Sequence, residues 1–163
     1  MFKYKLDLLA VFLLLAFFPL FFFKLGQSSL VSFDEAWYAD IARNILKNGD
    51  PINLTWNGGA FTDHPPGGFW LTAISYLIFG VSEFSARFSS VVSGMLTLLF
   101  VYLLGKKLFN RVVGLASAVA LSSSPWFLFR ARSGNLDIPL TLFFVLTFFL
   151  AVKGVDDKKY LLP

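Results

Sequence analysis

The chain has 163 residues, of which 56% are hydrophobic, 18% aromatic and only 15% charged. About a quarter of the residues in soluble domains are charged, and a single core of this size could not bury 21 phenylalanines. The absence of cysteine excludes a disulfide framework and a thiolate metal site. The net charge of +4 comes mostly from basic residues at the ends of apolar runs, a pattern that indicates lipid head-group anchoring and not nucleic-acid binding. We therefore expect a membrane protein.

The first apolar run extends from Leu8 to Phe23, with basic residues before it and Lys24 after it. Such a start is compatible with a secretory signal peptide or with a first transmembrane span. The run is long for a signal peptide, and the KLGQSS that follows offers no small-x-small cleavage site. We favour an uncleaved first span over about residues 6–25.

Three further uncharged runs are bracketed by charged residues, and the first two are 18 residues long. That length is close to what a helix with a rise of about 1.5 Å per residue needs to cross about 30 Å of hydrocarbon. No residue pattern in them favours strands, and only helices or closed barrels span lipid. The expected spans are residues 88–106, 112–130 and 136–154.

The stretch Pro65–Ser82 is also uncharged, but its continuous apolar part is too short to cross the bilayer and suits a surface or re-entrant helix. Charge placement supports this choice. With four spans, eight basic residues lie inside and six outside; if Pro65–Ser82 also crossed, five would lie inside and nine outside. The positive-inside rule therefore favours four spans, an outer loop over residues 26–87 and both termini in the cytoplasm.

The outer loop carries its own structural signals. The residues from Ser32 to Glu35 resemble a capping box, and the helix that they begin is expected to end at Asn48, before Gly49. Its apolar residues recur at three- and four-residue steps, which predicts an amphipathic helix in the head-group layer with Trp37 and Tyr38 as interfacial anchors. Further on, WNGG from Trp56 predicts a hairpin turn.

Several charged residues of this face are candidates for function. Asp34 and Glu35 lie in the first turn of the predicted helix, where they either complement the helix dipole or carry chemistry. Asp63 and His64 precede two prolines that stiffen the chain, and His64 is the only histidine. Asp137 begins the last apolar run next to a pair of arginines, Arg130 and Arg132, and a carboxylate at that depth needs a partner or a task.

Several motifs together resemble one family. DEAWYADIAR from Asp34 is followed in order by DHPP from Asp63, GVSEFSAR from Gly80, YLLGKKLF from Tyr102 and LDIP from Leu136. This ordered set resembles the GT-C glycosyltransferases. The closest group is glycosyltransferase family 39, with its aminoarabinose transferases and dolichyl-phosphate-mannose protein mannosyltransferases.

The resemblance implies an all-α membrane fold that transfers one sugar from a polyprenyl-phosphate donor to a lipid, protein or glycan acceptor. The reaction would occur at the extracytoplasmic face of the cell membrane as a single inverting displacement. Asp34, with Glu35 beside it, would be the catalytic pair, and Asp34 would act as the general base; a lipid phosphate leaves without a second carboxylic acid. The expected substrate-binding residues are Tyr38, Asp63, His64, Arg87 and Asp137.

Two features depart from the family pattern. Many relatives have Glu-Lys where this chain has Asp63 and His64, so a positive charge there depends on protonation of the imidazole. The chain is also much shorter than GT-C enzymes, so we expect it to be an N-terminal portion that is inactive alone. The chemistry requires no cofactor; if a divalent cation binds, Asp63, His64 and Asp137 are its candidate ligands.

Two other classes of function compete with glycosyl transfer. A membrane scaffold or flippase-like subunit of envelope glycan assembly would retain the fold without the chemistry. A small-molecule transporter is disfavoured because transporters place ionisable residues near the midplane of broken helices, whereas the predicted spans carry no charge internally.

Overall fold

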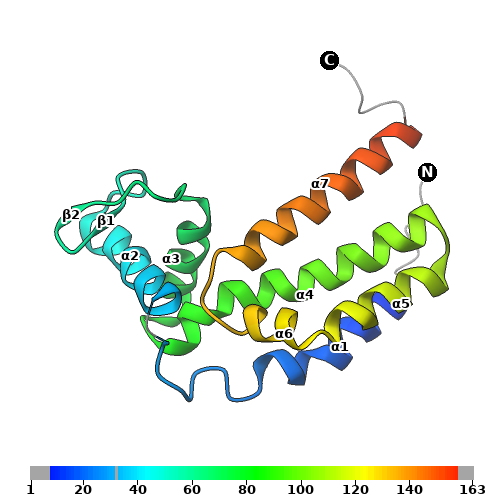
Figure 1. Ribbon diagram of the computed structural model, residues 1–163, viewed down its shortest axis with the longest axis horizontal. Coiled ribbons are helices and arrows are strands. Elements are labelled where there is room, and N and C mark those ends of the chain that lie inside the picture. The colour runs from blue at the N-terminus through cyan, green and yellow to red at the C-terminus, as the bar shows by residue number, and fades with distance from the viewer. Residues whose placement is uncertain (1–7, 32, 158–163) are drawn as a thin grey trace.

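The computed structural model describes residues 8–31 and 33–157. Within them the chain forms seven helices and one hairpin of two short strands, which confirms the all-α membrane architecture. Figure 1 shows two parts: a bundle of helices, and a smaller lobe at one end of it that holds α2, the hairpin and α3. The elements are α1 (Leu8–Phe22), α2 (Asp34–Asn48), β1 (Thr55–Trp56), β2 (Gly59–Ala60), α3 (Gly67–Phe79), α4 (Glu83–Leu108), α5 (Arg111–Ser122), α6 (Pro125–Ala131) and α7 (Asp137–Asp157).

Helix α4 is the axis of the bundle and packs against α1, α3, α5, α6 and α7. It begins with a capping box, in which the side chains of Ser82 and Ser85 each accept a hydrogen bond from the other's backbone N–H. Small residues let its neighbours approach closely. A Cβ atom built on Gly105 would lie 2.8 Å from the Cα of Gly114, so the turn between α4 and α5 depends on these two glycines.

Two of the four predicted spans, at residues 88–106 and 136–154, correspond to single long helices. Helices α4 and α7 are long and apolar enough to cross a membrane. The span expected at 112–130 is instead a pair of helices, α5 and α6, bent by 72° at the break between them. The break has a local cause: Pro125 disfavours helical geometry at Ser124, whose hydroxyl caps the new helix by accepting from the N–H of Phe127.

The first predicted span begins outside the described residues. Its described part is α1, whose 15 residues include Pro19 near the end. The helix packs against α4, and Phe21 and Leu25 enter the core cluster of the bundle. This packing identifies α1 as a member of the bundle.

Helix α3 has 13 residues, too few to span, as expected for a surface or re-entrant helix. Its outer side carries exposed large apolar residues, among them Ile74, Leu77 and Ile78. Helix α2 differs from the expectation for this region. Its apolar side packs on α3 and the hairpin through Ile41 and Ile45, so these residues are covered by protein.

The start of α2 is also different from the predicted capping box. The N-cap is Phe33, at a φ of 75°, and among the described residues no side chain makes a capping hydrogen bond there. Ser32 lies outside the described residues. The carboxylate of Glu35 does accept a hydrogen bond from a preceding backbone N–H, but this donor is Val31, at 2.8 Å. At the other end, Gly49 closes the helix in the left-handed conformation, as predicted.

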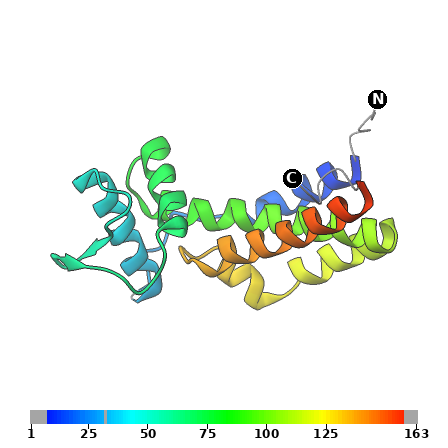
Figure 2. The same cartoon turned by 90° about the horizontal axis from the view of Figure 1, so that it is seen from above.

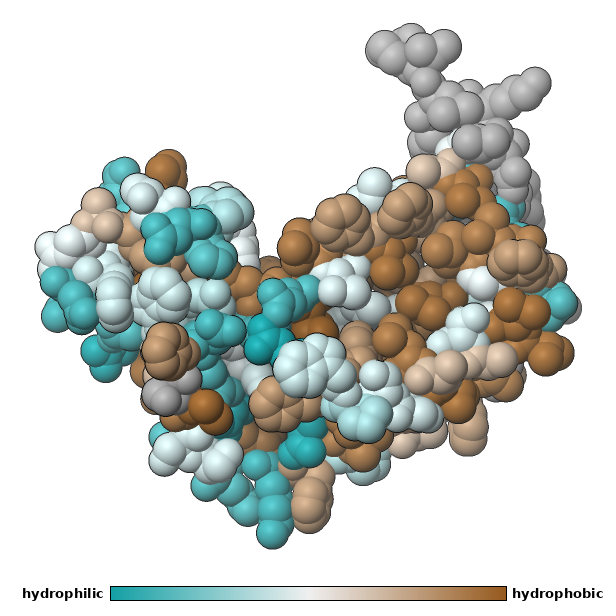
Figure 3. Space-filling view, in the orientation of Figure 1, coloured by the Kyte–Doolittle hydropathy of each residue, from teal (hydrophilic) through white to brown (hydrophobic). Residues whose placement is uncertain are grey.

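The bundle and the lobe differ in surface character. Figure 3 shows mainly hydrophobic residues over the bundle and mainly hydrophilic residues over the lobe. In both views of the ribbon, the lobe lies beyond the same end of α4, next to the start of α7 (Figure 2). The polar loop segments and the α6–α7 turn therefore share one end of the molecule.

Candidate active site

The first turn of α2 points two carboxylates in different directions, because successive side chains on a helix are about 100° apart. Asp34 faces the turn between α6 and α7, and about half of its side chain is exposed. Glu35 is buried beneath it, with 5% of its side chain exposed. The positive φ of Phe33 is a strained conformation for a bulky residue, and it sets the direction from which the chain enters this turn.

Arg130, near the end of α6, joins Asp34 to Asp137. Its guanidinium lies 3.6 Å from Asp34 (Nη1 to Oδ2) and donates a hydrogen bond to Asp137 through Nη2. Asp137 begins α7, and Asn135 fixes that start by accepting from the N–H groups of Asp137 and Ile138. The arginine is only 20% exposed, whereas the two carboxylates are 49% and 65% exposed. The site thus presents two accessible carboxylates held by one partly buried cation.

Tyr38 lies one turn along α2 from Asp34. Its hydroxyl is 3.2 Å from Nε2 of His64, and its ring lies edge-on to those of His64 and Phe69. Burial and the nearby carboxylates of Asp34 and Asp137 raise the pKa of Tyr38, and Arg130 offsets only part of the effect. The phenol therefore remains protonated near neutral pH and is available as a hydrogen-bond donor.

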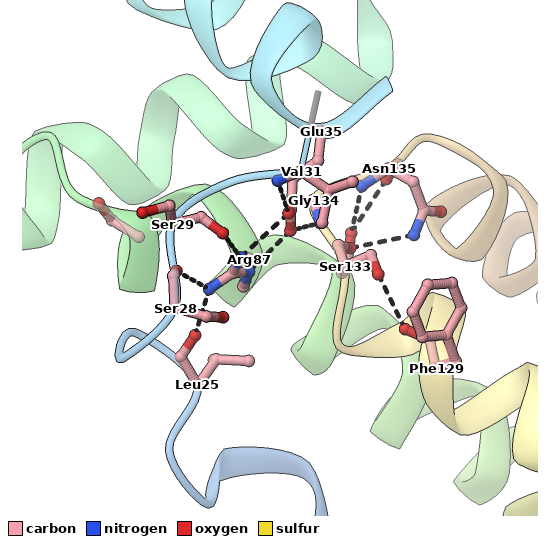
Figure 4. A network of polar contacts seen from close by, with 12 residues as sticks. Leu25, Ser28, Ser29, Val31, Glu35, Arg87, Phe129, Ser133, Gly134 and Asn135 are labelled. Carbon is pink, nitrogen blue, oxygen red and sulfur yellow. Dashed lines mark hydrogen bonds and ion pairs between the residues drawn. The ribbon is translucent and has the colours of Figure 1, made fainter. Parts of the chain in front are cut away.

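Glu35 and Arg87 form a buried ion pair that links three distant segments (Figure 4). Nε and Nη2 of Arg87 donate to the two carboxylate oxygens at 2.7 and 3.0 Å. Glu35 also accepts from the N–H groups of Val31 and Gly134. The remaining N–H groups of Arg87 donate to the backbone carbonyls of Leu25, Ser28 and Ser29.

All five N–H groups of Arg87 therefore have a partner within the protein. The guanidinium has no donor left for a substrate phosphate unless this network opens. Gly134 is tightly enclosed, since a Cβ there would lie 3.0 Å from the carbonyl oxygen of Ala86 and 3.3 Å from Cγ of Glu35. The geometry favours a structural task for Glu35 and Arg87, holding the start of α2 against α4 and the α6–α7 turn.

This network predicts a pH dependence of stability. Burial by itself would raise the pKa of Glu35, but the hydrogen bonds from Arg87, Val31 and Gly134 outweigh it and hold the pKa below its ordinary value. A lowered pKa in the folded state contributes stability above the unfolded-state pKa, and this contribution is lost as pH falls through the folded-state pKa. We expect the free energy of unfolding in detergent to fall more steeply below about pH 4.5 for the native chain than for Glu35→Gln. Parallel curves for the two would contradict the assignment.

Asp63 is close to the site but not part of the Arg130 cluster. It borders a groove of about 630 Å³ with Phe33, Ala36, Trp37 and Trp56. His64 stacks on Phe61 and lies edge-on to Trp37. Two buried nitrogens of this aromatic cluster, Nδ1 of His64 and Nε1 of Trp37, have no hydrogen-bond partner among the described residues.

The candidate metal ligands are not brought together. Across residues 8–31 and 33–157, no group of three or more histidine, aspartate or glutamate side chains is placed to hold a metal ion. His64 bonds to Tyr38, while Asp137 bonds to Arg130 on another element. The described part of the structure therefore does not gather Asp63, His64 and Asp137 into one group.

Two cavities meet at Arg130. One, of about 300 Å³, is bordered by Asp34, Phe129, Ser133 and Asn135. The other, of about 520 Å³, follows the bend between α5 and α6 and is mostly apolar apart from Ser124, Asp137 and Thr141. Both cavities have mainly apolar walls and both are bordered by Arg130, and a cation between apolar walls suits an amphiphilic ligand with an anionic head.

Residues 63–162 match the sequence profile of the dolichyl-phosphate-mannose-protein mannosyltransferase family. The chain belongs to this family. The match covers more than half of the chain and includes α3 to α7. It confirms the resemblance to family 39, which was drawn from the ordered motifs of the sequence.

Individual relatives also match over most of this chain. The chain is 33% identical over 141 residues to a protein of Aquifex aeolicus, covering 86% of this chain. It is 35% identical over 151 residues to the undecaprenyl phosphate-α-4-amino-4-deoxy-L-arabinose arabinosyl transferase of Pseudomonas savastanoi pv. phaseolicola, covering 90% of this chain. In both comparisons it spans only 28% of the relative's length.

Solved structures support the family fold. The apo form of ArnT from Cupriavidus metallidurans superposes with a TM-score of 0.82 at 25% identity, over 90% of this chain and 27% of that protein. The form bound to undecaprenyl phosphate gives 0.83 at 24% identity, over 92% and 28%. The partial GT-C fold expected from the sequence is thereby confirmed.

One residue of this family member's site was not assigned a role from the sequence. In the sequence, Arg130 has the position of an ordinary flanking charge at the end of an apolar run. In the structure it contacts the carboxylates of both Asp34 and Asp137. A local signal did exist: the Ser-Gly-Asn turn after Arg132 predicts that the chain reverses there, which places Arg130 beside the start of α7. What local sequence does not contain is the approach of α2 to this turn.

Proposed function

We propose that this chain forms part of a glycosyltransferase that moves a sugar from a polyprenyl-phosphate donor to an acceptor hydroxyl at the extracytoplasmic face of the membrane. The observation that carries the proposal is the cluster of Asp34, Arg130 and Asp137 at the polar end of the bundle. In it, two exposed carboxylates and a cation share one point where an apolar groove ends. Hydrolysis or transfer at a sugar–phosphate bond uses these components.

In the proposed reaction, Asp34 takes the proton of the acceptor hydroxyl as its oxygen forms a bond to the anomeric carbon. The bond from that carbon to the phosphate oxygen breaks on the opposite side, and its electron pair leaves with the polyprenyl phosphate. The anomeric configuration is inverted, since a single displacement occurs. The half-exposed position of Asp34 supports this role, because a base must reach the proton that it removes.

The leaving phosphate needs donors and positive charge. Arg130 can turn one edge of its guanidinium from the carboxylates to a phosphate oxygen, and the protonated hydroxyl of Tyr38 supplies a second donor. Asp137 would keep Arg130 oriented and bind sugar hydroxyls. The groove at the α5–α6 bend is suited to the first part of the lipid chain, because its lining is mainly apolar and it begins at Arg130.

The roles first expected for Glu35 and Arg87 change within this proposal. Because Arg87 donates all its N–H groups to Glu35 and three carbonyls, we assign the pair to positioning rather than to phosphate binding. It secures Asp34 on one side and, through Gly134, the α6–α7 turn on the other. Asp63 and His64 remain candidates for contacts to the sugar or the acceptor beside the aromatic groove.

The direct test uses the full-length protein in proteoliposomes with a series of polyprenyl-phosphate sugars that carry a radiolabel in the sugar. We expect label to move from one donor to an extractable acceptor, with one polyprenyl phosphate formed for each sugar transferred. The product should have the opposite anomeric configuration to the donor. If no donor in the series loses its label while the protein is folded, the scaffold or flippase-like alternative is favoured.

A further inference from the structure

A cavity bordered by basic residues lies beside the candidate active site, on the other side of Glu35. This cavity, of about 190 Å³, is bordered by Lys24, Ser28, Phe129, Arg132 and Ser133, with Glu35 and Arg87 among its other lining residues. It shares Val31, Glu35, Phe129 and Ser133 with the cavity beside Asp34. The proposed transfer assigns no role to Lys24 or Arg132, the two cations of this cavity that lie outside the Glu35–Arg87 pair.

The charge of this cavity is unbalanced. Both oxygens of Glu35 are occupied by Arg87 and by backbone N–H groups, so that pair is neutral as a unit. Lys24 and Arg132 remain, and within the part of the chain that the structure describes neither has a carboxylate partner. Two positive charges therefore face one small cavity.

The donors of Arg132 are only partly used. Its Nη2 donates to the carbonyl oxygen of Phe23, which holds the guanidinium next to Lys24. Its Nε is buried and has no hydrogen-bond partner among the described residues. Leaving a buried charged donor unpaired is costly, so an external acceptor at this atom would be favourable.

Lys24 borders the same cavity. It has a φ of 55°, an uncommon conformation for a residue other than glycine, and follows directly after α1. Its ammonium group lies 5.4 Å from the centre of the Phe23 ring. Uncommon backbone conformations of this kind gather at binding sites, where neighbouring structure enforces them.

The surroundings identify the kind of molecule that carries the acceptor. Phe23 and Phe129 are 65% and 55% exposed, and Phe129 borders the cavity together with Ser28 and Ser133. Apolar side chains beside paired cations match the boundary between acyl chains and head groups. We propose that Lys24 and Arg132 bind the phosphate of an anionic phospholipid at the membrane surface, next to the candidate active site.

Binding of the lipid can be measured with the full-length protein in detergent micelles, independently of sugar transfer. Native mass spectrometry would compare dioleoyl phosphatidylglycerol with dioleoyl phosphatidylcholine, which has the same acyl chains but no net charge. We expect a preference for phosphatidylglycerol that weakens about tenfold in Lys24→Gln and in Arg132→Gln, since each loses a charge-assisted hydrogen bond. The double variant should show no preference.

Three further arms keep the test decisive. Lys47→Gln removes the same charge from an exposed position on α2 and should bind like the native protein. Arg132→Lys retains the charge but lacks Nε, so partial loss of binding would assign a role to that atom. Inorganic phosphate in the place of lipid distinguishes the source of the phosphate: strong competition by it would overturn recognition of a lipid, and native affinity in the double variant would overturn the site itself.

Discussion

Replacing Arg87 by methionine is expected to lower the free energy of unfolding by about 3–5 kcal/mol, because the carboxylate of Glu35 would remain buried without its cation. Both side chains are 5% exposed, so water cannot replace the lost partner without opening the core. The same change would release the carbonyls of Leu25, Ser28 and Ser29. Unfolding of the full-length protein in mixed micelles, followed by circular dichroism, measures the loss.

The matched control is Arg43→Met, which removes an arginine from the exposed ion pair with Asp40 on α2. Surface pairs contribute between zero and about 1 kcal/mol, so this variant should unfold almost as the native protein does. Combining Arg87→Met with Glu35→Leu removes both charges and should recover part of the stability lost in the single variant. Equal loss in Arg87→Met and Arg43→Met would show that the buried network does not hold these segments together.

Replacing Asp34 by asparagine is expected to reduce sugar transfer by the full-length protein by about 10²–10⁴-fold, the usual contribution of a general base. Asparagine has the same shape, and Asp34 is about half exposed, so folding should be unaffected. The loss should appear in kcat with little change in KM for the donor. Initial rates at saturating donor, together with a thermal unfolding curve of each variant, separate these effects.

Asp40→Asn is the control for this substitution, because Asp40 lies on the same helix and is paired only with Arg43 in the described structure. It should transfer sugar at the native rate. If Asp34→Asn also retains that rate while the native protein is active, Asp34 is not the base. Asp137, the other exposed carboxylate on Arg130, would then be the next residue to replace.

Local sequence predicted the elements whose cause is local. The end of α2 at Gly49, the hairpin at Asn57 and Gly58, and the short helix after Pro66 all depend on residues within one turn of the feature. The bend between α5 and α6 also has a local cause, Pro125, but the uncharged run around it predicts one continuous span. Hydropathy reports whether a segment prefers lipid, and it carries no information about where a helix is interrupted.

The sequence by itself determined that this is a membrane protein with a polar lobe at one end, since composition and charge placement leave few other ways to satisfy its apolar runs. The sequence also predicted that Asp34 and Asp137 lie on the same, outer face of the membrane. Only the tertiary structure decided that Glu35 and Arg87, 52 residues apart, neutralise each other, and that Arg130 joins two carboxylates from different elements. The physical reason is that burial and pairing of a charge depend on which distant segments pack against it, and that packing is not encoded in any local pattern.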